Sequence, residues 1–241
     1  MKTSNKIILG ILLVGFGSLM AAQLALHKKI EDNSYITTPI YEDMFYSQYN
    51  PIGIKHVYIY NIAACKIFPA DTLKLAFENG VVQYAKYNVA GDTLRITGVY
   101  AQGAPGGFRL YRSSQDVRLY LPTGIPVLAV NSNIDVRGTT KQSSARNYSF
   151  DLNNSGIDSR LNAYKDSVHR YFDTITINAH HNSGAYFYIC DYVKTLNITL
   201  DTSVIYDNYA PIGQINLVAK RKSTVVLSGD NLKNLNSTII K

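Results

Sequence analysis

Apolar and polar residues follow one pattern at the start of the chain and another in the remainder. The segment 7–26 reads IILGILLVGFGSLMAAQLAL, twenty residues without a formal charge, in which Gln23 is the only strongly polar side chain. A helix of that length spans a bilayer core of about 30 Å. We therefore predict a single transmembrane helix at 7–26 within an N-terminal tail and anchor at 1–29, with the lipid bilayer as its partner.

A cleavable signal peptide is the alternative reading of this segment. Its apolar stretch is usually shorter and ends in a small-x-small site, whereas Ala22 here is preceded at the −3 position by Met20. Lysines flank the span on both sides, so the positive-inside rule does not orient it. The body is rich in Asn, Ser, Thr and Tyr, which favours export. We expect a single-pass protein of the cytoplasmic membrane with its body on the periplasmic, extracytoplasmic side, or else a secreted body after cleavage.

The pattern changes to short alternating runs after a polar, Tyr-rich connector at 30–53. From residue 54 onward, runs such as HVYIYNI and DTLRITGVY alternate apolar and polar positions and are separated by Gly, Asn, Asp and Pro. β-Branched and aromatic residues dominate these runs, which is typical of strands. No later stretch has a convincing helical period, so we predict an all-β domain over 54–241.

The second half of this domain contains an internal repeat. Five segments align at spacings of 23, 28, 20 and 20 residues with one serine in common, namely Ser132, Ser155, Ser183, Ser203 and Ser223. A unit of about 20 residues with two short strands cannot bury its apolar face alone and must stack on its neighbours. The repeat therefore predicts a parallel β-solenoid (β-helix), right-handed by the general rule for parallel crossovers.

Strand alternation assigns a face to each position of the repeat. Two residues after the serine stand Ile134, Ile157, Ala185, Ile205 and Val225, which we expect to point inward as an aliphatic stack. Three and five residues after it we expect outward side chains. These supply a strip of predicted ligand-contact residues: Asp135, Arg137, Asp158, Arg160, Tyr186, Tyr188 and Tyr206. The acids and arginines predict a small ion-pair grid. A merely solvated face is the alternative, while the tyrosines favour contact with a ligand.

Several segments together resemble a known family. The N-terminal span, IKHVYIYNI, GDTLRITG, LYLPTGIPVLAVNSNIDVRG and the NSG repeats are similar to the bacterial auto-transporter adhesin family with a head GIN domain. The resemblance covers most of 35–235. This chain has more Tyr and less Gly and Ser in its repeats than better matches, so it is a divergent member. The resemblance implies an exposed β-solenoid with an adhesive cell-envelope role and supplies no catalytic residues.

Charge and cysteine content narrow the function classes. The net charge is +7, but residues 1–29 hold four lysines and no acid, which leaves 20 cations against 17 acids and a net +3 for the body. A body so nearly balanced lacks the electrostatic footprint of a nucleic-acid binder. Cys65 and Cys190 each lie in an apolar stretch, so we expect two buried thiols, with one bridge as the alternative.

Enzymatic signatures are absent from the sequence. GAPGG at 103–107 lacks the Lys-Ser/Thr of a phosphate loop, and adjacent His180 and His181 would face opposite sides of a strand, so we predict no cofactor and no metal. Asp135 with Asp158 is the pair that a polysaccharide-acting enzyme would use. We expect the neighbouring arginines to keep both carboxylates ionised, so that neither could act as a general acid.

The sequence therefore predicts a membrane-anchored, exported, non-catalytic β-solenoid that acts as an adhesin-like binding module. A glycan or another envelope protein is the expected partner. A polysaccharide-acting β-helix enzyme and a purely structural envelope scaffold are the alternatives.

Overall fold

The computed structural model describes residues 15–21, 23, 24, 27, 46–78, 85–98, 117–139, 141–158, 170–188, 191–220 and 222–240. The chain divides into two compact units, 1–46 and 47–241. The described residues of the first unit are helical, apart from Tyr46, which begins the first strand. No helix among the described residues is both long enough and apolar enough to cross a bilayer. Much of the predicted span 7–26 lies outside those residues, so the anchor and its boundaries stay predictions.

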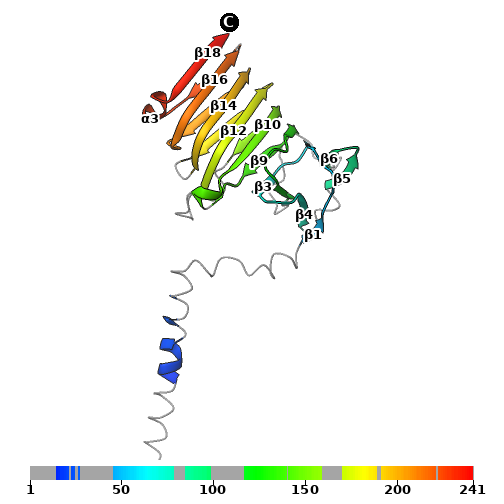
Figure 1. The fold of residues 1–241 in the computed structure, drawn as a ribbon, viewed down its shortest axis with the longest axis vertical. Helices are drawn as coiled ribbons and strands as arrows, with labels where there is room; N and C mark the ends of the chain where they lie inside the picture. Colours follow the sequence, from blue (N-terminus) through cyan, green and yellow to red (C-terminus); the bar gives the residue numbers. More distant parts are fainter. Residues whose placement is uncertain are drawn as a thin grey trace, which may run out of the picture. The chain divides into compact units, whose positions relative to one another are not determined.

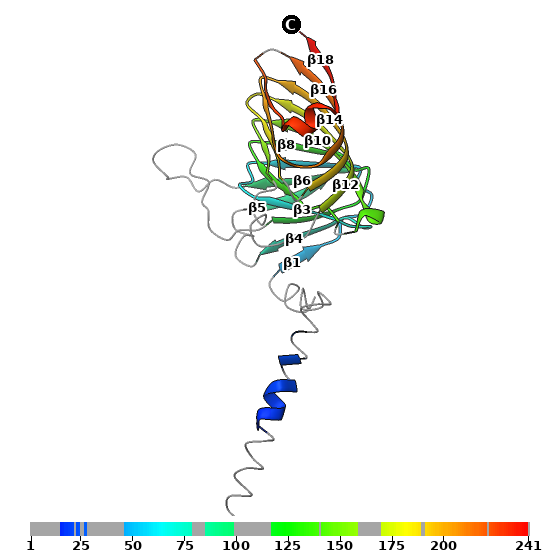
Figure 2. The same ribbon diagram turned by 90° about the vertical axis from the view of Figure 1, so that its left-hand side faces the viewer.

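The body is mostly β and consists of two nine-stranded sheets, here named sheet A and sheet B (Figures 1 and 2). In spatial order, sheet A contains β1 (Tyr46–Tyr49), β4 (Lys74–Glu78), β7 (Val117–Leu121), β3 (Cys65–Pro69), β9 (Asn133–Val136), β11 (Gly156–Asp158), β13 (Gly184–Tyr188), β15 (Val204–Asn208) and β17 (Thr224–Val226). Sheet B contains β18 (Leu235–Ile240), β16 (Ile212–Lys220), β14 (Asp191–Asp201), β12 (Arg170–His180), β10 (Arg146–Asn153), β8 (Val127–Val130), β2 (His56–Tyr60), β6 (Thr93–Gly98) and β5 (Ala85–Ala90). Among the described residues of the body, helix is limited to short pieces such as α3 (Gly229–Leu232) and the 3₁₀ turn Gln142–Ser144.

From β8 onward the chain alternates between the two sheets, and each strand pairs in parallel with the equivalent strand of the next coil. Ile157 is paired with both Ile134 and Ala185, Ala185 with Ile205, and Ile205 with Val225. The predicted repeat column is thus confirmed in register from β9 to β17. This stacking is what a parallel β-solenoid requires; its right-handedness stays a prediction.

The start of the body departs from a simple stack. β2 lies between β6 and β8, and β3 between β7 and β9, so the first coil in sequence is the second in space. β4 pairs antiparallel with β7, and β5 antiparallel with β6. Antiparallel strands cannot continue a parallel coil, so they end the stack on this side. The sequence pattern showed strands here but not their order.

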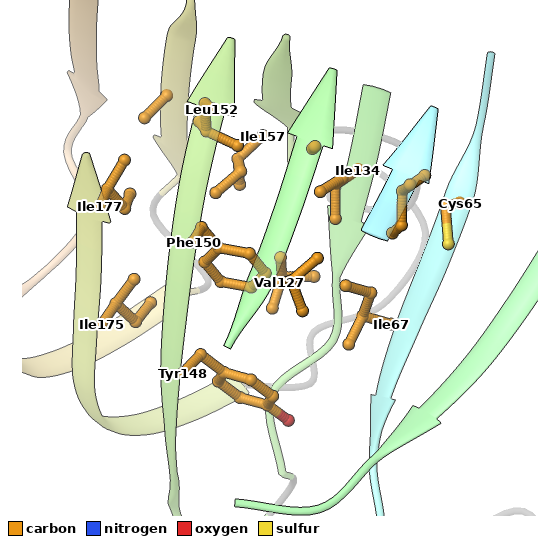
Figure 3. Packing of buried hydrophobic residues seen from close by; sticks show 14 of the residues in the cluster. Cys65, Ile67, Val127, Ile134, Tyr148, Phe150, Leu152, Ile157, Ile175 and Ile177 are labelled. Carbon is orange, nitrogen blue, oxygen red and sulfur yellow. The ribbon is translucent and has the colours of Figure 1, made fainter. Parts of the chain in front are cut away.

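The core lies between the two sheets (Figure 3). Inward positions alternate along each strand as predicted, and Ile134, Ile157, Ala185 and Ile205 are at most 2% exposed, while Val225 in the last coil is partly buried. The buried hydrophobic cluster extends through all the inner strands, with Phe150 and Tyr148 from β10 beside Val127 from β8 in Figure 3. Cys65 is fully buried in this core. Cys190 lies outside the described residues.

The recurrence of serine in each coil has a structural cause at the corner between sheet B and sheet A. Ser132, Ser155, Ser183 and Ser203 are all at most 5% exposed. The backbone N–H of Ser132 donates to Oγ of Ser155 at 3.0 Å, and the N–H of Ser155 donates to Oγ of Ser183 at 3.2 Å. Each hydroxyl therefore satisfies a buried backbone donor of the neighbouring coil, which an alanine could not do.

An asparagine ladder accompanies the serines at the same corner. Asn61, Asn131 and Asn154 have positive φ values of 56°, 49° and 48°, a conformation that Asn tolerates better than other non-glycine residues. The amide of Asn154 donates to Oδ1 of Asn131, and the amide of Asn131 to Oδ1 of Asn61. The first coil thus shares this corner although it has Ile62 in place of the serine.

Candidate binding surface

The outward positions of sheet A bring most of the predicted contact residues onto one face. Asp158 is paired with Tyr186, and Tyr186 with Tyr206. The next coil continues the column with Val226. In the other direction, the pairing of Ile157 with Ile134 places Asp135 in the same column. Arg160 and the side chain of Asp158 lie outside the described residues.

The tyrosines form a well-defined pair on this face. The rings of Tyr186 and Tyr206 are stacked with their centroids 5.4 Å apart and their planes 5° from parallel. Tyr206 is 40% exposed, and Val226 beyond it is 41% exposed. Offset parallel stacking is a favourable aromatic geometry, and the hydroxyl of each ring adds hydrogen-bonding capacity.

Glycine at position 184 lets the Tyr186 ring lie back over its own strand. A Cβ placed on Gly184 would be 2.8 Å from Cε2 and 3.2 Å from Oη of Tyr186. Any other residue would therefore displace the ring. We name the six outward positions of these three coils the tyrosine patch: Gly184, Tyr186, Val204, Tyr206, Thr224 and Val226. Tyr188, two residues along β13, is half-buried beside it.

Asp135 differs from its expected setting. Alternation sends it away from the core, since Ile134 and Val136 on either side are buried, yet Asp135 itself is only 3% exposed. Its Oδ2 is 2.7 Å from Nη2 of Arg137, which is 16% exposed, so the predicted ion pair within this coil is confirmed. The expectation that Asp135 is solvent-exposed is wrong, and cationic neighbours from other strands also act on its carboxylate.

Two of those neighbours were missed by the sequence analysis. Arg170 at the start of β12 is 8% exposed and forms an ion pair at 2.8 Å with the buried Asp191 of β14, its partner in the sheet B register. Arg170 also attracts the Asp135 carboxylate, as does Lys66 of β3. The aligned runs that begin RYFDTITI and DYVKTLNI would have revealed the Arg170–Asp191 pair if the repeat had been extended to their first residues.

Burial sets the proton affinity of Asp135. Desolvation raises the pKa of its carboxyl above the ordinary value, and the attractions of Arg137, Arg170 and Lys66 only partly offset this. Oδ1 accepts no hydrogen bond from the described residues. The arginines therefore do not bring the pKa of this carboxyl below its ordinary value, because desolvation outweighs the ion pair.

The other candidate chemistry is not assembled in the described part of the chain. Groups of three or more His, Cys, Asp or Glu side chains that could hold a metal ion are absent from it. His180 ends β12, with Nε2 3.8 Å from Oδ1 of Asp151, and His181 has a positive φ of 51° at the corner, as expected for a loop before Asn182. The pair Asp135–Asp158 cannot be assessed as a catalytic pair, because only the first side chain is described.

Comparison with known proteins gives no family. No family model matches the chain, and no curated protein does either. Three crystal structures that bear the name "putative adhesin" are similar. The one from Parabacteroides distasonis is 9% identical, with a TM-score of 0.46, over 75% of this chain and 71% of that chain. The one from Bacteroides fragilis is 8% identical, with a TM-score of 0.33, over 80% and 94%. The one from Parabacteroides merdae is 9% identical, with a TM-score of 0.36, over 75% and 79%.

Proposed function

We propose that this chain is a non-catalytic, adhesin-like binding module of the bacterial cell envelope and that the tyrosine patch is its contact surface. The observation that carries the proposal is the parallel pair Tyr186 and Tyr206, which stands in register on a sheet face, with Tyr186 partly buried and Tyr206 40% exposed. Exposed aromatic rings in a fixed arrangement are more typical of a contact surface than of a merely solvated one.

The solenoid suits such a role physically. Tyr side chains have only two rotatable torsions, and the stacked coils hold their backbone rigidly, so little conformational entropy is lost when a ligand is bound. Tyr188 borders the patch, while Asp158 belongs to the preceding coil. Asp135 and Arg137, by contrast, are joined to each other in an ion pair.

A binding role is favoured over catalysis by the position of the only described carboxylate in the strip. Asp135 is 3% exposed and is engaged by Arg137, so a polysaccharide chain lying on this face would not reach it. A general acid must come within hydrogen-bond distance of the bond that it cleaves.

The proposal includes the location of the body. The apolar run 7–26 would anchor it in the cytoplasmic membrane, and the polar, Asn-rich and Tyr-rich body would lie on the extracytoplasmic side. Alkaline extraction of membranes, combined with protease treatment of intact and permeabilised cells, tests this. Cleavage of the body only after the inner membrane is lysed would contradict the orientation.

The binding proposal is tested with the full chain in detergent on insoluble bacterial envelope material. Replacing Tyr186, Tyr188 and Tyr206 by Ala should leave the circular dichroism spectrum of the body unchanged and weaken retention by roughly tenfold or more. The matched control replaces Tyr58 and Tyr60, which stack on sheet B with centroids 6.1 Å apart. Equal retention of wild type, triple variant and control would overturn the proposal and favour a structural scaffold.

A further inference from the structure

The side chains of the tyrosine patch favour one chemical class of ligand over others. We infer that it takes a neutral pyranose sugar, with the CH face of the sugar ring on the aromatic pair and the hydroxyls at its rim. This inference rests on the proposed binding function and specifies the class of its ligand.

The first argument is the absence of charge. None of the six positions of the patch ionises near neutral pH, and they occupy three successive coils of a chain whose net charge is +7. An anionic polysaccharide would be recognised by cations, which this part of the face does not provide among its described positions.

The second argument is the combination of apolar faces and hydroxyl groups. Tyr206 and Val226 are exposed apolar surfaces, while the Tyr hydroxyls and the exposed Thr224 supply donors and acceptors. A pyranose has the complementary set, an apolar CH face surrounded by equatorial hydroxyls. The patch lies on the face of a sheet, so it offers no backbone edge with which an extended peptide would pair.

The third argument concerns Gly184, which we assign as a positioning residue. The ring of Tyr186 is parallel to that of Tyr206 in the position where it lies over Gly184. The atoms that a Cβ at this position would meet belong to the far end of a side chain, so an alanine would move the ring and leave the backbone in place. The Gly184→Ala variant therefore tests the arrangement of the two tyrosine rings while both tyrosines are still present.

The chain offers a matched control one coil away. Gly156 occupies the same column, and a Cβ there would lie 2.9 Å from Oδ1 of Asn133, also the end of a side chain. Gly156→Ala makes the same substitution at the equivalent position of the preceding coil, where the added Cβ meets Asn133 and not a tyrosine. Near-ultraviolet circular dichroism, which reports the environment of Tyr in this Trp-free chain, should change in Gly184→Ala and stay unchanged in Gly156→Ala.

The experiment measures binding of the full chain in detergent to three probes: laminarin, which is a neutral β-glucan, mannan, which is also neutral, and polygalacturonate, which is acidic. We expect binding to at least one neutral probe with little salt dependence. Gly184→Ala and Tyr206→Ala should each weaken it about fivefold to tenfold, and Gly156→Ala should not.

The outcomes separate this inference from the proposed function. If envelope retention depends on the tyrosines but neither neutral probe binds, the sugar class is wrong and the binding function stands. Salt-sensitive binding to polygalacturonate alone also overturns the neutral class. Neutral-probe binding that survives in Gly184→Ala, despite a changed Tyr spectrum, overturns the positioning role. If neither the probes nor the envelope material require the tyrosines, both proposals fail.

Discussion

The outward column that runs from β9 to β15 of sheet A keeps one backbone register, but its two ends have opposite surroundings. At β9 the outward residue is Asp135, 3% exposed and joined to Arg137 at 2.7 Å. At β13 and β15 the equivalent residues are Tyr186 and Tyr206, whose rings are stacked. Tyr206 is exposed to solvent. One end of a single column is thus a buried ionic contact, and the other is an exposed aromatic one.

This difference shows that the direction of a side chain and its accessibility are separate properties. The repeat fixes the direction, since every residue in the column points away from the core. Accessibility depends on what the neighbouring strands and corners bring to that side, which at Asp135 includes Arg170 from sheet B. A strip read from the repeat is therefore divided in space into a part that stabilises the fold and a part that is available to a ligand.

The largest effect is expected at the ionic end. Arg137→Ala would leave Asp135 buried without its closest cation and should lower the free energy of unfolding by about 3 kcal/mol, measured by urea denaturation at neutral pH. The loss should shrink at acid pH, where Asp135 is protonated and needs no counter-ion.

The control is a paired replacement. Asp135→Leu together with Arg137→Met removes both charges and should restore much of the stability, because no buried charge is left unpaired. Envelope retention should not change in either variant if the tyrosine end alone binds. A loss below about 0.5 kcal/mol in Arg137→Ala would contradict the buried ion pair.

A smaller effect is expected at the corner that underlies the tyrosine end. Ser183 is fully buried; its hydroxyl donates to the carbonyl oxygen of His180 at 2.5 Å and accepts from the N–H of Ser155 at 3.2 Å. Ser183→Ala should cost about 1–2 kcal/mol, since it leaves a buried backbone donor unsatisfied. The urea midpoint measures this, and Ser223→Ala in the half-buried last coil is the control, with a smaller expected loss. Equal losses would show that burial of the ladder is unimportant.

Much of this architecture could be predicted from the repeat itself. The column Ile134, Ile157, Ala185 and Ile205 requires only strand alternation and one serine per unit, so its register and burial followed from the sequence. The Tyr186–Tyr206 stack follows from the same alignment, because equal positions on adjacent parallel coils lie about 4.8 Å apart.

The remainder depends on contacts between parts of the chain that no local pattern connects. The insertion of β2 between β6 and β8 joins segments far apart in sequence, and alternation is the same for any order of coils. The electrostatic surroundings of Asp135 include Arg170 at the other sheet, and the position of the Tyr186 ring depends on the absence of a Cβ at Gly184. Such features arise from packing in three dimensions.

The raised pKa of Asp135 predicts a pH dependence that belongs to the ionic end alone. Above the ordinary value of 3.8 and up to the raised pKa, the folded state holds a proton that the unfolded state has lost. This group therefore stabilises the fold at low pH, and the contribution is lost as pH rises through the raised pKa. Asp135→Asn should remove that part of the pH dependence, as followed by urea midpoints on the acid side of neutrality. An unchanged profile would show that Asp135 is not the titrating group.

The smallest effect on stability is expected at the tyrosine end. Its size, set against the effect at Asp135, tests directly whether the two ends of the column have different roles. Tyr206→Ala removes a 40% exposed ring and one stacking contact, so the free energy of unfolding should fall by only about 0.5 kcal/mol. Val226→Ala, 41% exposed on the next coil, is the matched control for loss of an exposed apolar group. Thermal unfolding of the full chain measures both. A large loss of stability in Tyr206→Ala would make the stacked pair a structural contact like the ion pair at Asp135. A small loss together with weakened envelope retention would assign stability to one end of the face and binding to the other.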